Sequence, residues 1–241
     1  SIRHAMTKFS NFHFTANNET KRRLIKMGEV SKNIFPVGCP SIDALKSEKT
    51  VNKSIILKKF NINIKKKYIL IIQHPVTSEL YDSKKQFIET VAAIKKINLQ
   101  HLIIFPNNDA GSVNIVSLIK KSNLNYVQSP DLKEYKTLLN SCSALVGNSS
   151  SGIHEAASFK VPVVNIGTRQ QGRFKPKNVI SVNYSRKKIY LAIKKALSKS
   201  FKYRIRDIKN PYGEGNSAKK IIEIIKKIDL KNFNTQKQIT Y

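Results

Sequence analysis

The stretch Ala144-Leu-Val-Gly-Asn-Ser-Ser-Ser-Gly-Ile-His-Glu-Ala-Ala-Ser-Phe-Lys-Val-Pro-Val-Val-Asn-Ile166 decides the fold, because its pattern changes three times. The apolar run Ala144–Val146 predicts a short buried strand, and Gly147–Gly152 predicts a loop of small residues. Ile153–Phe159 then predicts a helix and Val161–Ile166 a second strand. A strand, a helix and a strand in direct succession indicate neighbouring strands that run parallel.

The same alternation extends over most of the chain. Further strands are predicted at 67–73, 102–105, 126–127 and 179–182, and further helices at 83–97, 113–121, 132–140, 187–198 and 217–228. Short strands and helices in strict alternation predict the α/β class, with a doubly wound, Rossmann-like parallel sheet. Such sheets bind ligands at the carboxyl ends of their strands. The candidate site residues are therefore the polar ones that follow apolar runs, namely His74, Asn107, Ser149, Ser150 and Arg169.

The first 38 residues predict a separate body. A strand at 12–16, a helix at 19–27 and a strand at 33–37 cannot bury both faces of a sheet alone. We expect residues 1–38 to be the tail of a preceding α/β domain, 39–210 the nucleotide-sugar-binding domain, and 211–241 a C-terminal helix that crosses back, with its tail. Ser1 as a true start, after removal of methionine, is the alternative.

The composition is that of a globular protein with a large positive charge. Apolar residues make up 40% and charged residues 24%, and the formal net charge is +29. Of the 44 basic residues, 36 are lysines, many of them in pairs on predicted helices, whereas base readout relies on arginine. We therefore expect no nucleic-acid partner, although the charge favours an anionic sugar nucleotide.

Three features that the sequence lacks predict where in the cell the protein is found. The apolar runs are strand-sized, so no membrane-spanning helix is expected. The first ten residues lack the apolar core of a signal peptide. Cys39 and Cys142 lie far apart and fit no metal-ligand spacing, as reduced thiols of a cytoplasmic protein do.

The strongest chemical motif is Gly147-Asn-Ser-Ser-Ser-Gly-Ile-His-Glu155. Backbone N–H groups at a helix start suit a diphosphate, and Ser149, Ser150 and Ser151 add hydroxyl donors. Gly152 would let the backbone approach a ligand closely. Glu155 would accept the two hydroxyls of a ribose. An ordinary helix capped by a serine explains the same residues equally well.

The other motifs are weaker when taken singly. His74, within Gln73-His-Pro-Val-Thr77, can contact phosphate or act as an acid, but a structural histidine is the common alternative. The turn around Asn107 and the exposed Arg169 also have ordinary explanations. The sequence shows no metal-ligand cluster, phosphate-binding P-loop, Ser/His/Asp spacing or paired carboxylates.

Together these stretches resemble the UDP-N-acetylglucosamine 2-epimerase family, and more closely its hydrolysing branch from sialic-acid and cell-surface polysaccharide pathways. The resemblance follows the family's order of motifs over nearly the whole chain. The matching segments are Ser1-Ile-Arg-His-Ala-Met-Thr-Lys8, Gly38-Cys-Pro-Ser41, Gln73-His-Pro-Val-Thr77, Phe105-Pro-Asn-Asn-Asp-Ala-Gly-Ser112, Gly147–Glu155, Gly167-Thr-Arg-Gln170 and Tyr212-Gly-Glu-Gly-Asn216.

The resemblance implies two Rossmann domains arranged as in GT-B glycosyltransferases, with the UDP-sugar between them and no redox cofactor or metal. Ser149 and Ser150 would bind the diphosphate, Glu155 the ribose, and Asn107 and Arg169 other parts of the nucleotide. His74 would assist departure of UDP in a supporting catalytic role. The reaction would convert UDP-N-acetylglucosamine to N-acetylmannosamine and UDP by elimination and hydration.

The family's main acid/base carboxylates belong to the N-terminal domain, and we expect them to be absent from this chain. The implied partners are that missing domain or a split subunit, and a second copy in a homodimer. The isolated chain is expected to be inactive. Half of a GT-B glycosyltransferase and a non-catalytic nucleotide-sugar-binding remnant remain alternatives. The sequence does not determine which sugar nucleotide is bound.

Overall fold

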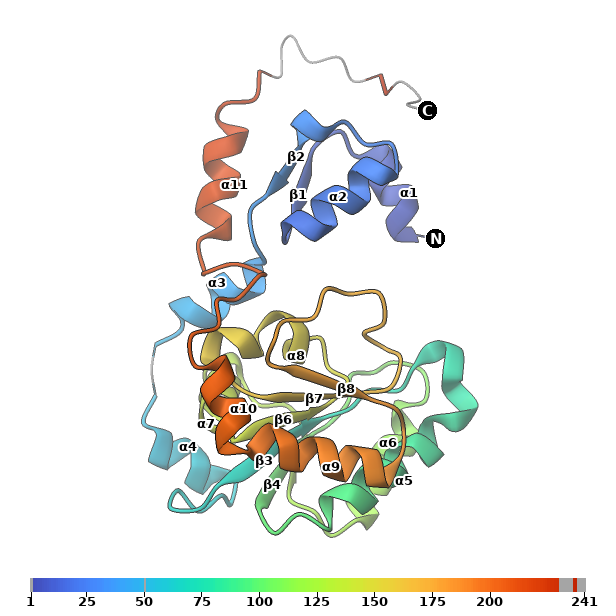
Figure 1. Ribbon diagram of the computed structural model, residues 1–241, viewed down its shortest axis with the longest axis vertical. Coiled ribbons are helices and arrows are strands. Elements are labelled where there is room, and N and C mark those ends of the chain that lie inside the picture. Colours follow the sequence, from blue (N-terminus) through green and yellow to red (C-terminus); the bar gives the residue numbers. More distant parts are fainter. Residues whose placement is uncertain (1, 50, 230–235, 238–241) are drawn as a thin grey trace. The chain divides into compact units, whose positions relative to one another are not determined.

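The computed structural model describes residues 2–49, 51–229 and 236–237 (Figure 1). By contacts between Cα atoms the chain forms two compact units, each of which is described by itself. Unit 1 contains residues 1–47 and 210–241, and unit 2 contains residues 48–209. Residues 39–47 thus group with unit 1, whereas the sequence analysis placed them in the nucleotide-sugar-binding domain.

Unit 2 is built on a six-stranded parallel sheet in the order β5-β4-β3-β6-β7-β8. The strand bounds are β3 Tyr68–Ile72, β4 Gln100–Ile104, β5 Tyr126–Val127, β6 Ala144–Gly147, β7 Val163–Ile166 and β8 Val179–Val182. The chain builds outward from β3 through β4 to β5, and then returns to the other side of β3 with β6. The α/β class and the doubly wound parallel sheet are confirmed, and the switch point lies between β3 and β6.

Strand β3 shows why the sheet is covered on both faces. All five of its residues are buried, and they alternate between two apolar clusters. Ile69 and Ile71 pack in the cluster that includes Phe87 of α5 (Ser83–Ile94), while Leu70 and Ile72 pack in the cluster that includes Leu138 of α7 (Leu132–Ser141). A continuous apolar run is therefore required in this strand, because neither face meets water.

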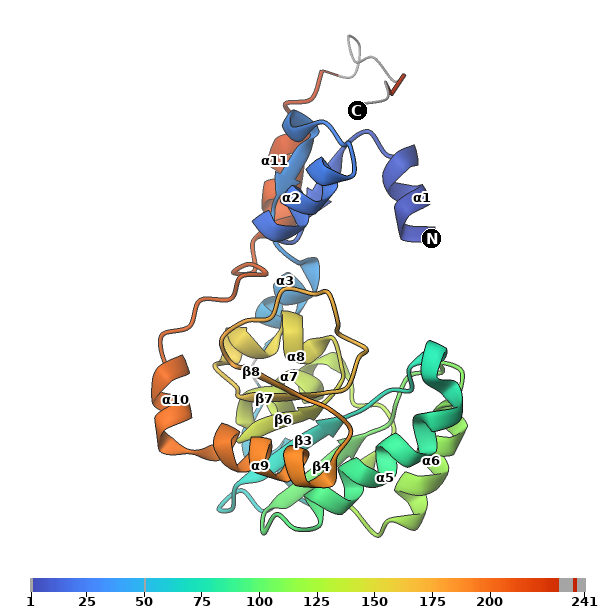
Figure 2. The same ribbon diagram turned by 45° about the vertical axis from the view of Figure 1, so that its right-hand side comes forward.

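Helices cover both faces of this sheet. Figure 2 shows α5, α6 and α9 on one side and α7 and α8 on the other. The helices of unit 2 are α4 Lys53–Lys59, α5 Ser83–Ile94, α6 Ser112–Lys121, α7 Leu132–Ser141, α8 Ser151–His154, α9 Arg186–Leu197 and α10 Lys199–Ile205, with 3-10 turns η2 Thr77–Asp82 and η3 Ala156–Phe159.

Unit 1 contains the predicted strand–helix–strand. The parallel strands β1 (His13–Thr15) and β2 (Ile34–Pro36) are joined by α2 (Asn18–Lys26) and the 3-10 turn η1 (Ser31–Asn33). The Asn17 side chain caps α2 by accepting from the Thr20 N–H at 2.9 Å. Helix α1 (Ile2–Phe9) precedes them and has no buried residue among those described.

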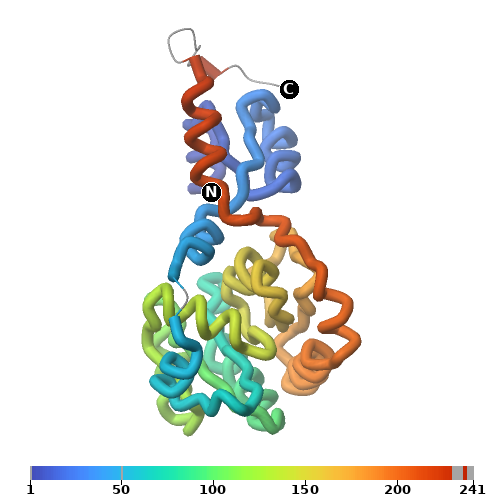
Figure 3. Tube along the Cα trace, turned by 90° about the vertical axis from the view of Figure 1, so that its left-hand side faces the viewer, coloured from blue at the N-terminus to red at the C-terminus, as the bar shows by residue number. Residues whose placement is uncertain are grey.

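The C-terminal helix α11 (Ser217–Ile225) belongs to unit 1, where Figure 3 shows it beside the N-terminal elements. It packs on α3 (Pro40–Ser47), whose Asp43 carboxylate accepts from the Ala218 N–H at 2.7 Å. The Cys39 N–H also donates to the Tyr212 carbonyl at 2.7 Å. These bonds cap the start of α11 and tie residues 210–225 to residues 37–43.

Some predicted elements were wrong or missing. The helix predicted at Ile153–Phe159 is broken at Glu155, where one α-helical turn gives way to a 3-10 turn. Helices α1, α3, α4 and α10 were not predicted, because each is seven or eight residues long and too short for a clear helical period. No helix within the described ranges is long and apolar enough to cross a membrane.

Gly147, at the end of β6, generates a stability prediction. Its φ is +132°, and a Cβ there would lie 2.0 Å from the Ile72 carbonyl oxygen of β3. Gly172 also has a positive φ but open space around it. Positive φ alone costs about 1–2 kcal/mol. We expect Gly147→Ala to lower the free energy of unfolding by at least about 2 kcal/mol more than Gly172→Ala, because β3 and β6 must separate.

Urea denaturation of the two variants against the unmodified chain measures this difference. Equal losses in both variants would show that β3 and β6 tolerate the added methyl group.

Candidate functional site

The site lies where β3 and β6 end side by side. Asn148, directly after β6, joins the two ends. Its N–H donates to the Ile72 carbonyl at 3.1 Å. Its side-chain oxygen accepts from the His74 N–H at 2.7 Å, and its side-chain nitrogen donates to the His74 carbonyl at 2.8 Å. The amide therefore replaces strand pairing for one more residue and holds the two loops together at the switch point.

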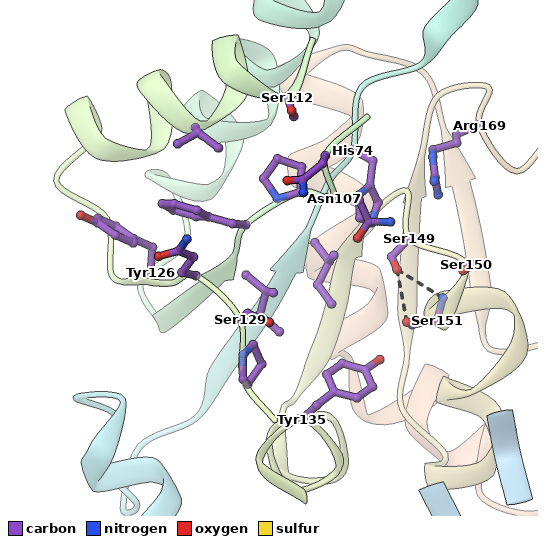
Figure 4. Close-up of a pocket in the computed structure, with 18 of the residues that line it drawn as sticks. His74, Asn107, Ser112, Tyr126, Ser129, Tyr135, Ser149, Ser150, Ser151 and Arg169 are labelled. Atoms are coloured by element: carbon purple, nitrogen blue, oxygen red, sulfur yellow. Dashed lines mark hydrogen bonds between the residues drawn. The ribbon is translucent and has the colours of Figure 1, made fainter. Parts of the chain in front are cut away.

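A cavity of about 1030 Å³ opens at this edge (Figure 4). Five of the six predicted site residues line it: His74, Asn107, Ser149, Ser150 and Arg169. Glu155 is not among the lining residues. The other lining residues are Ile72, Ile104, Phe105, Pro106, Asn108, Ser112, Val116, Lys120, Tyr126, Gln128, Ser129, Pro130, Tyr135 and Ser151. No aspartate or glutamate belongs to this set, which covers only the described part of the chain.

The serine loop presents donors without a long helix behind it. The Ser149 hydroxyl donates to the Ser151 hydroxyl at 3.2 Å and accepts from the Ser151 N–H at 3.3 Å. In the described structure, the N–H groups of Ser149 and Ser150 have no protein acceptor. Helix α8 is a single turn, so its dipole is small. The loop therefore offers individual donors and not the start of the longer helix that was expected.

Gly152 lies against a neighbouring strand of the sheet. A Cβ on this residue would lie 2.8 Å from the Cγ1 of Val163 in β7. The glycine therefore allows α8 to pack closely on the sheet, as the third glycine of dinucleotide-binding loops does.

Arg169 brings positive charge to the serine loop. It follows β7 and donates to the Asn148 carbonyl at 3.4 Å. Its other guanidinium nitrogen lies 3.6 Å from a carboxylate oxygen of Asp109. The neighbouring Gln170, buried and not singled out from sequence, donates to the same Asn148 carbonyl at 2.8 Å. Arg169 is thus positioned at the cavity edge, with the partly exposed Asp109 as its counter-charge.

His74 is a neutral side chain in this setting. It is 5% exposed, and its Nδ1 accepts from the Asn107 N–H at 3.1 Å. Burial, assisted by the nearby Arg169, lowers the pKa of His74 to about 4. The neutral ring that accepts at Nδ1 carries its proton on Nε2. His74 can therefore donate a hydrogen bond from Nε2 near neutral pH, but it is not a cation there.

The far end of the cavity carries an aromatic pair that the sequence analysis missed. The rings of Phe105 and Tyr126 stack with centroids 5.1 Å apart and an angle of 23° between their planes. Figure 4 shows Tyr126 across the cavity from Ser149 and Arg169. The sequence could have indicated this pair, because Phe105 directly follows β4 and Tyr126 belongs to the neighbouring strand β5. The cavity thus has a donor-rich, positive end and a flat aromatic end.

Within the described ranges, no group of three or more His, Cys, Asp or Glu side chains is placed to hold a metal ion.

Comparisons with known proteins agree on one family. The family model described as UDP-N-acetylglucosamine 2-epimerase matches residues 1–226. The hydrolysing UDP-N,N'-diacetylbacillosamine 2-epimerase of Legionella pneumophila is 36% identical over 238 residues, which is 95% of this chain and 61% of that protein. The chain therefore spans about three fifths of this relative's length.

Solved structures show the same fold. The UDP-GlcNAc 2-epimerase of Neisseria meningitidis, solved with UDP-GlcNAc, matches with a TM-score of 0.78 at 22% identity, over 92% of this chain and 63% of that one. The glycosyltransferase WaaG, involved in lipopolysaccharide biosynthesis, matches with a TM-score of 0.54 at 14% identity, over 89% of this chain and 62% of that one. The GT-B-like nature of the fold is thereby confirmed.

The buried His74 makes stability depend on pH. The unfolded chain takes up a proton near pH 6.5 and the folded chain only near pH 4. This contribution to stability is fully present above pH 6.5 and is lost as the pH falls toward 4. The free energy of unfolding should therefore decrease between pH 6.5 and 4, and we expect His74→Gln to make this decrease smaller by about 3 kcal/mol.

Urea titrations of both proteins across this pH range test the prediction, with other acidic groups cancelling in the difference. Parallel pH profiles would contradict a neutral, buried His74.

Proposed function

The chain belongs to the UDP-N-acetylglucosamine 2-epimerase family, and we propose that it is the nucleotide-sugar-binding part of a hydrolysing UDP-N-acetylhexosamine 2-epimerase. The main observation that supports this proposal is the cavity at the switch point, which has serine donors and Arg169 at one end and an aromatic pair at the other. Its volume of about 1030 Å³ is ample for a nucleoside diphosphate.

The two ends of the cavity support one orientation of the nucleotide. The diphosphate lies against Ser149, Ser150 and Arg169, whose hydroxyls, free N–H groups and positive charge complement it. The base lies toward Phe105 and Tyr126, since a flat apolar ring stacks favourably on aromatic side chains.

Glu155 and Asn107 complete the proposed nucleotide site. Glu155 accepts hydrogen bonds from the ribose, and Asn107 lines the middle of the cavity. In the proposed reaction, removal of the C2 proton forms the C1–C2 double bond while the C1–oxygen bond breaks and its electron pair leaves with UDP. Water then adds hydroxyl at C1 and hydrogen at C2.

The residues of this chain act on the departing diphosphate. Arg169 and the serine hydroxyls stabilise the negative charge that develops on the leaving oxygen. His74, neutral and protonated on Nε2, donates a hydrogen bond to that phosphate and so assists departure without a full proton transfer. These groups lower the barrier to UDP release but cannot remove a proton from C2.

The proton transfers require groups from elsewhere. The cavity has no carboxylate among its described lining residues, and the chain spans about three fifths of the relatives' length. We propose that the acid/base carboxylates belong to a further N-terminal domain or a separate subunit, and that the complete enzyme is a homodimer. A non-catalytic nucleotide-sugar-binding protein is the second candidate, which the missing carboxylates favour.

The diphosphate site is tested by Ser149→Ala. Loss of a hydrogen bond to a charged group costs about 1.5–3 kcal/mol, so UDP should bind about tenfold or more weakly. Uridine, which lacks phosphate, should bind as before. The exposed and remote Ser200→Ala is the matched control. Isothermal titration measures all three proteins, and an equal loss for uridine and UDP would contradict a phosphate contact.

Activity is tested with UDP-N-acetylglucosamine and phosphorus NMR. We expect negligible turnover by the 241-residue chain, because the described residues that line its cavity include no carboxylate to take the C2 proton. Addition of the N-terminal domain of a hydrolysing relative should release free UDP together with N-acetylmannosamine. Turnover by the chain alone would contradict the missing-carboxylate proposal, and UDP binding without any product in the complemented reaction would favour the non-catalytic candidate.

A further inference from the structure

Glu155 stands apart from the cavity to which the proposed function assigns it. It follows the single turn of α8 and does not line the cavity, whereas Tyr135 does. The Tyr135 hydroxyl donates to Oε2 of Glu155 at 3.0 Å. The carboxylate is therefore held by a side chain that itself borders the cavity, and Figure 4 shows Tyr135 at the same end as the serine loop.

Tyr135 is well fixed at the start of α7. Its N–H donates to the Asp131 carbonyl at 2.8 Å. Asp131 and Glu134 form a capping box, in which the Asp131 side chain accepts from the Glu134 N–H at 2.8 Å and the Glu134 side chain accepts from the Asp131 N–H at 3.1 Å. Glu134 also pairs with Lys59 of α4. The phenol ring packs against the apolar cluster below the sheet.

In the hydrogen bond between Tyr135 and Glu155, the phenol is the donor and the carboxylate is the acceptor. Burial, followed by the nearby Glu155 charge, raises the pKa of Tyr135 well above its usual value, so its hydroxyl stays protonated. A protonated phenol donates to a carboxylate, and a carboxylate has about four acceptor sites. A carboxylate can therefore accept from a phenol and from the hydroxyls of a ligand at the same time.

The Tyr135 hydroxyl also connects with the serine loop. The Ser151 hydroxyl lies near the phenol and acts to lower the pKa of Tyr135, against the larger effect of burial. Ser151 in turn accepts from Ser149 at 3.2 Å. The serine loop assigned to the diphosphate and the carboxylate assigned to the ribose thus both neighbour the Tyr135 hydroxyl.

We propose that Tyr135 is a positioning residue for ribose recognition, because its hydroxyl holds the Glu155 carboxylate in the orientation that accepts the 2′- and 3′-hydroxyls of a bound nucleoside diphosphate. The inference rests on the proposed function and goes beyond it by naming the residue that orients Glu155. Without the phenol hydroxyl, the Glu155 carboxylate loses the hydrogen bond that joins the end of α8 to α7.

The test compares two ligands on the full 241-residue chain by isothermal titration: UDP and 2′,3′-dideoxy-UDP, which lacks the ribose hydroxyls. The unmodified chain should prefer UDP. Tyr135→Phe keeps the ring and removes the hydroxyl, and we expect it to weaken UDP binding about tenfold. Binding of the dideoxy ligand should stay unchanged, so the preference for ribose falls about tenfold. A merely structural role would weaken both ligands equally.

Two further variants sharpen the test. Tyr203→Phe removes a hydroxyl from an exposed tyrosine of α10 and should leave both affinities unchanged. Glu155→Gln should also lower the preference for ribose, and adding Tyr135→Phe to it should produce little further loss, since both changes act through the same carboxylate.

The outcomes separate the two proposals. An unmodified chain that fails to bind UDP overturns the proposed function, and the role of Tyr135 with it. UDP binding with a ribose preference that survives Tyr135→Phe overturns the role of Tyr135 alone. Additive losses from Tyr135→Phe and Glu155→Gln would also overturn it, because the two residues would then act independently.

Discussion

The site depends on one buried side chain, that of Asn148. Two neighbouring parallel strands diverge at the switch point, and their exposed backbone groups need partners there. Asn148 supplies them by exchanging two hydrogen bonds with the backbone of His74, while its own carbonyl accepts from Arg169 and Gln170. Loops from three strands are thereby held at one point. The serine donors, the histidine and the arginine face the same cavity because this amide joins their loops.

The charges that line the cavity indicate the chemistry of its ligand more closely than the net charge of the chain does. Most lysines lie on helix surfaces, whereas the cavity wall combines one arginine, one lysine, several neutral donors and no described carboxylate. In the proposed function, such a wall stabilises a diphosphate as it binds and as it leaves, while its described residues include no carboxylate that could take the C2 proton. The buried, neutral His74 fits the same arrangement, since a second cation beside Arg169 would be costly. Binding and proton transfer thus belong to different parts of the proposed enzyme.

Much of this arrangement was predictable from local patterns. The apolar runs at β3, β4, β6 and β7 predicted strands, and His74, Asn107, Ser149, Ser150 and Arg169 were expected at their carboxyl ends. Prediction failed where the local pattern was short or ambiguous. The helix expected over Ile153–Phe159 breaks at Glu155 to meet β7 closely through Gly152, and the short helices α3 and α4 begin at a proline and after an asparagine cap without a readable period.

The sequence by itself determined the order of strands and helices, and therefore a parallel sheet whose polar residues meet at one edge, because burial and hydrogen bonding act locally along the chain. Only the tertiary structure decided what those residues are chemically. The neutral state of His74, the junction at Asn148, the stacked Phe105 and Tyr126, and the link from Tyr135 to Glu155 arise from contacts between separate strands and helices. Such contacts depend on strand register and helix packing, which no local pattern of residues specifies.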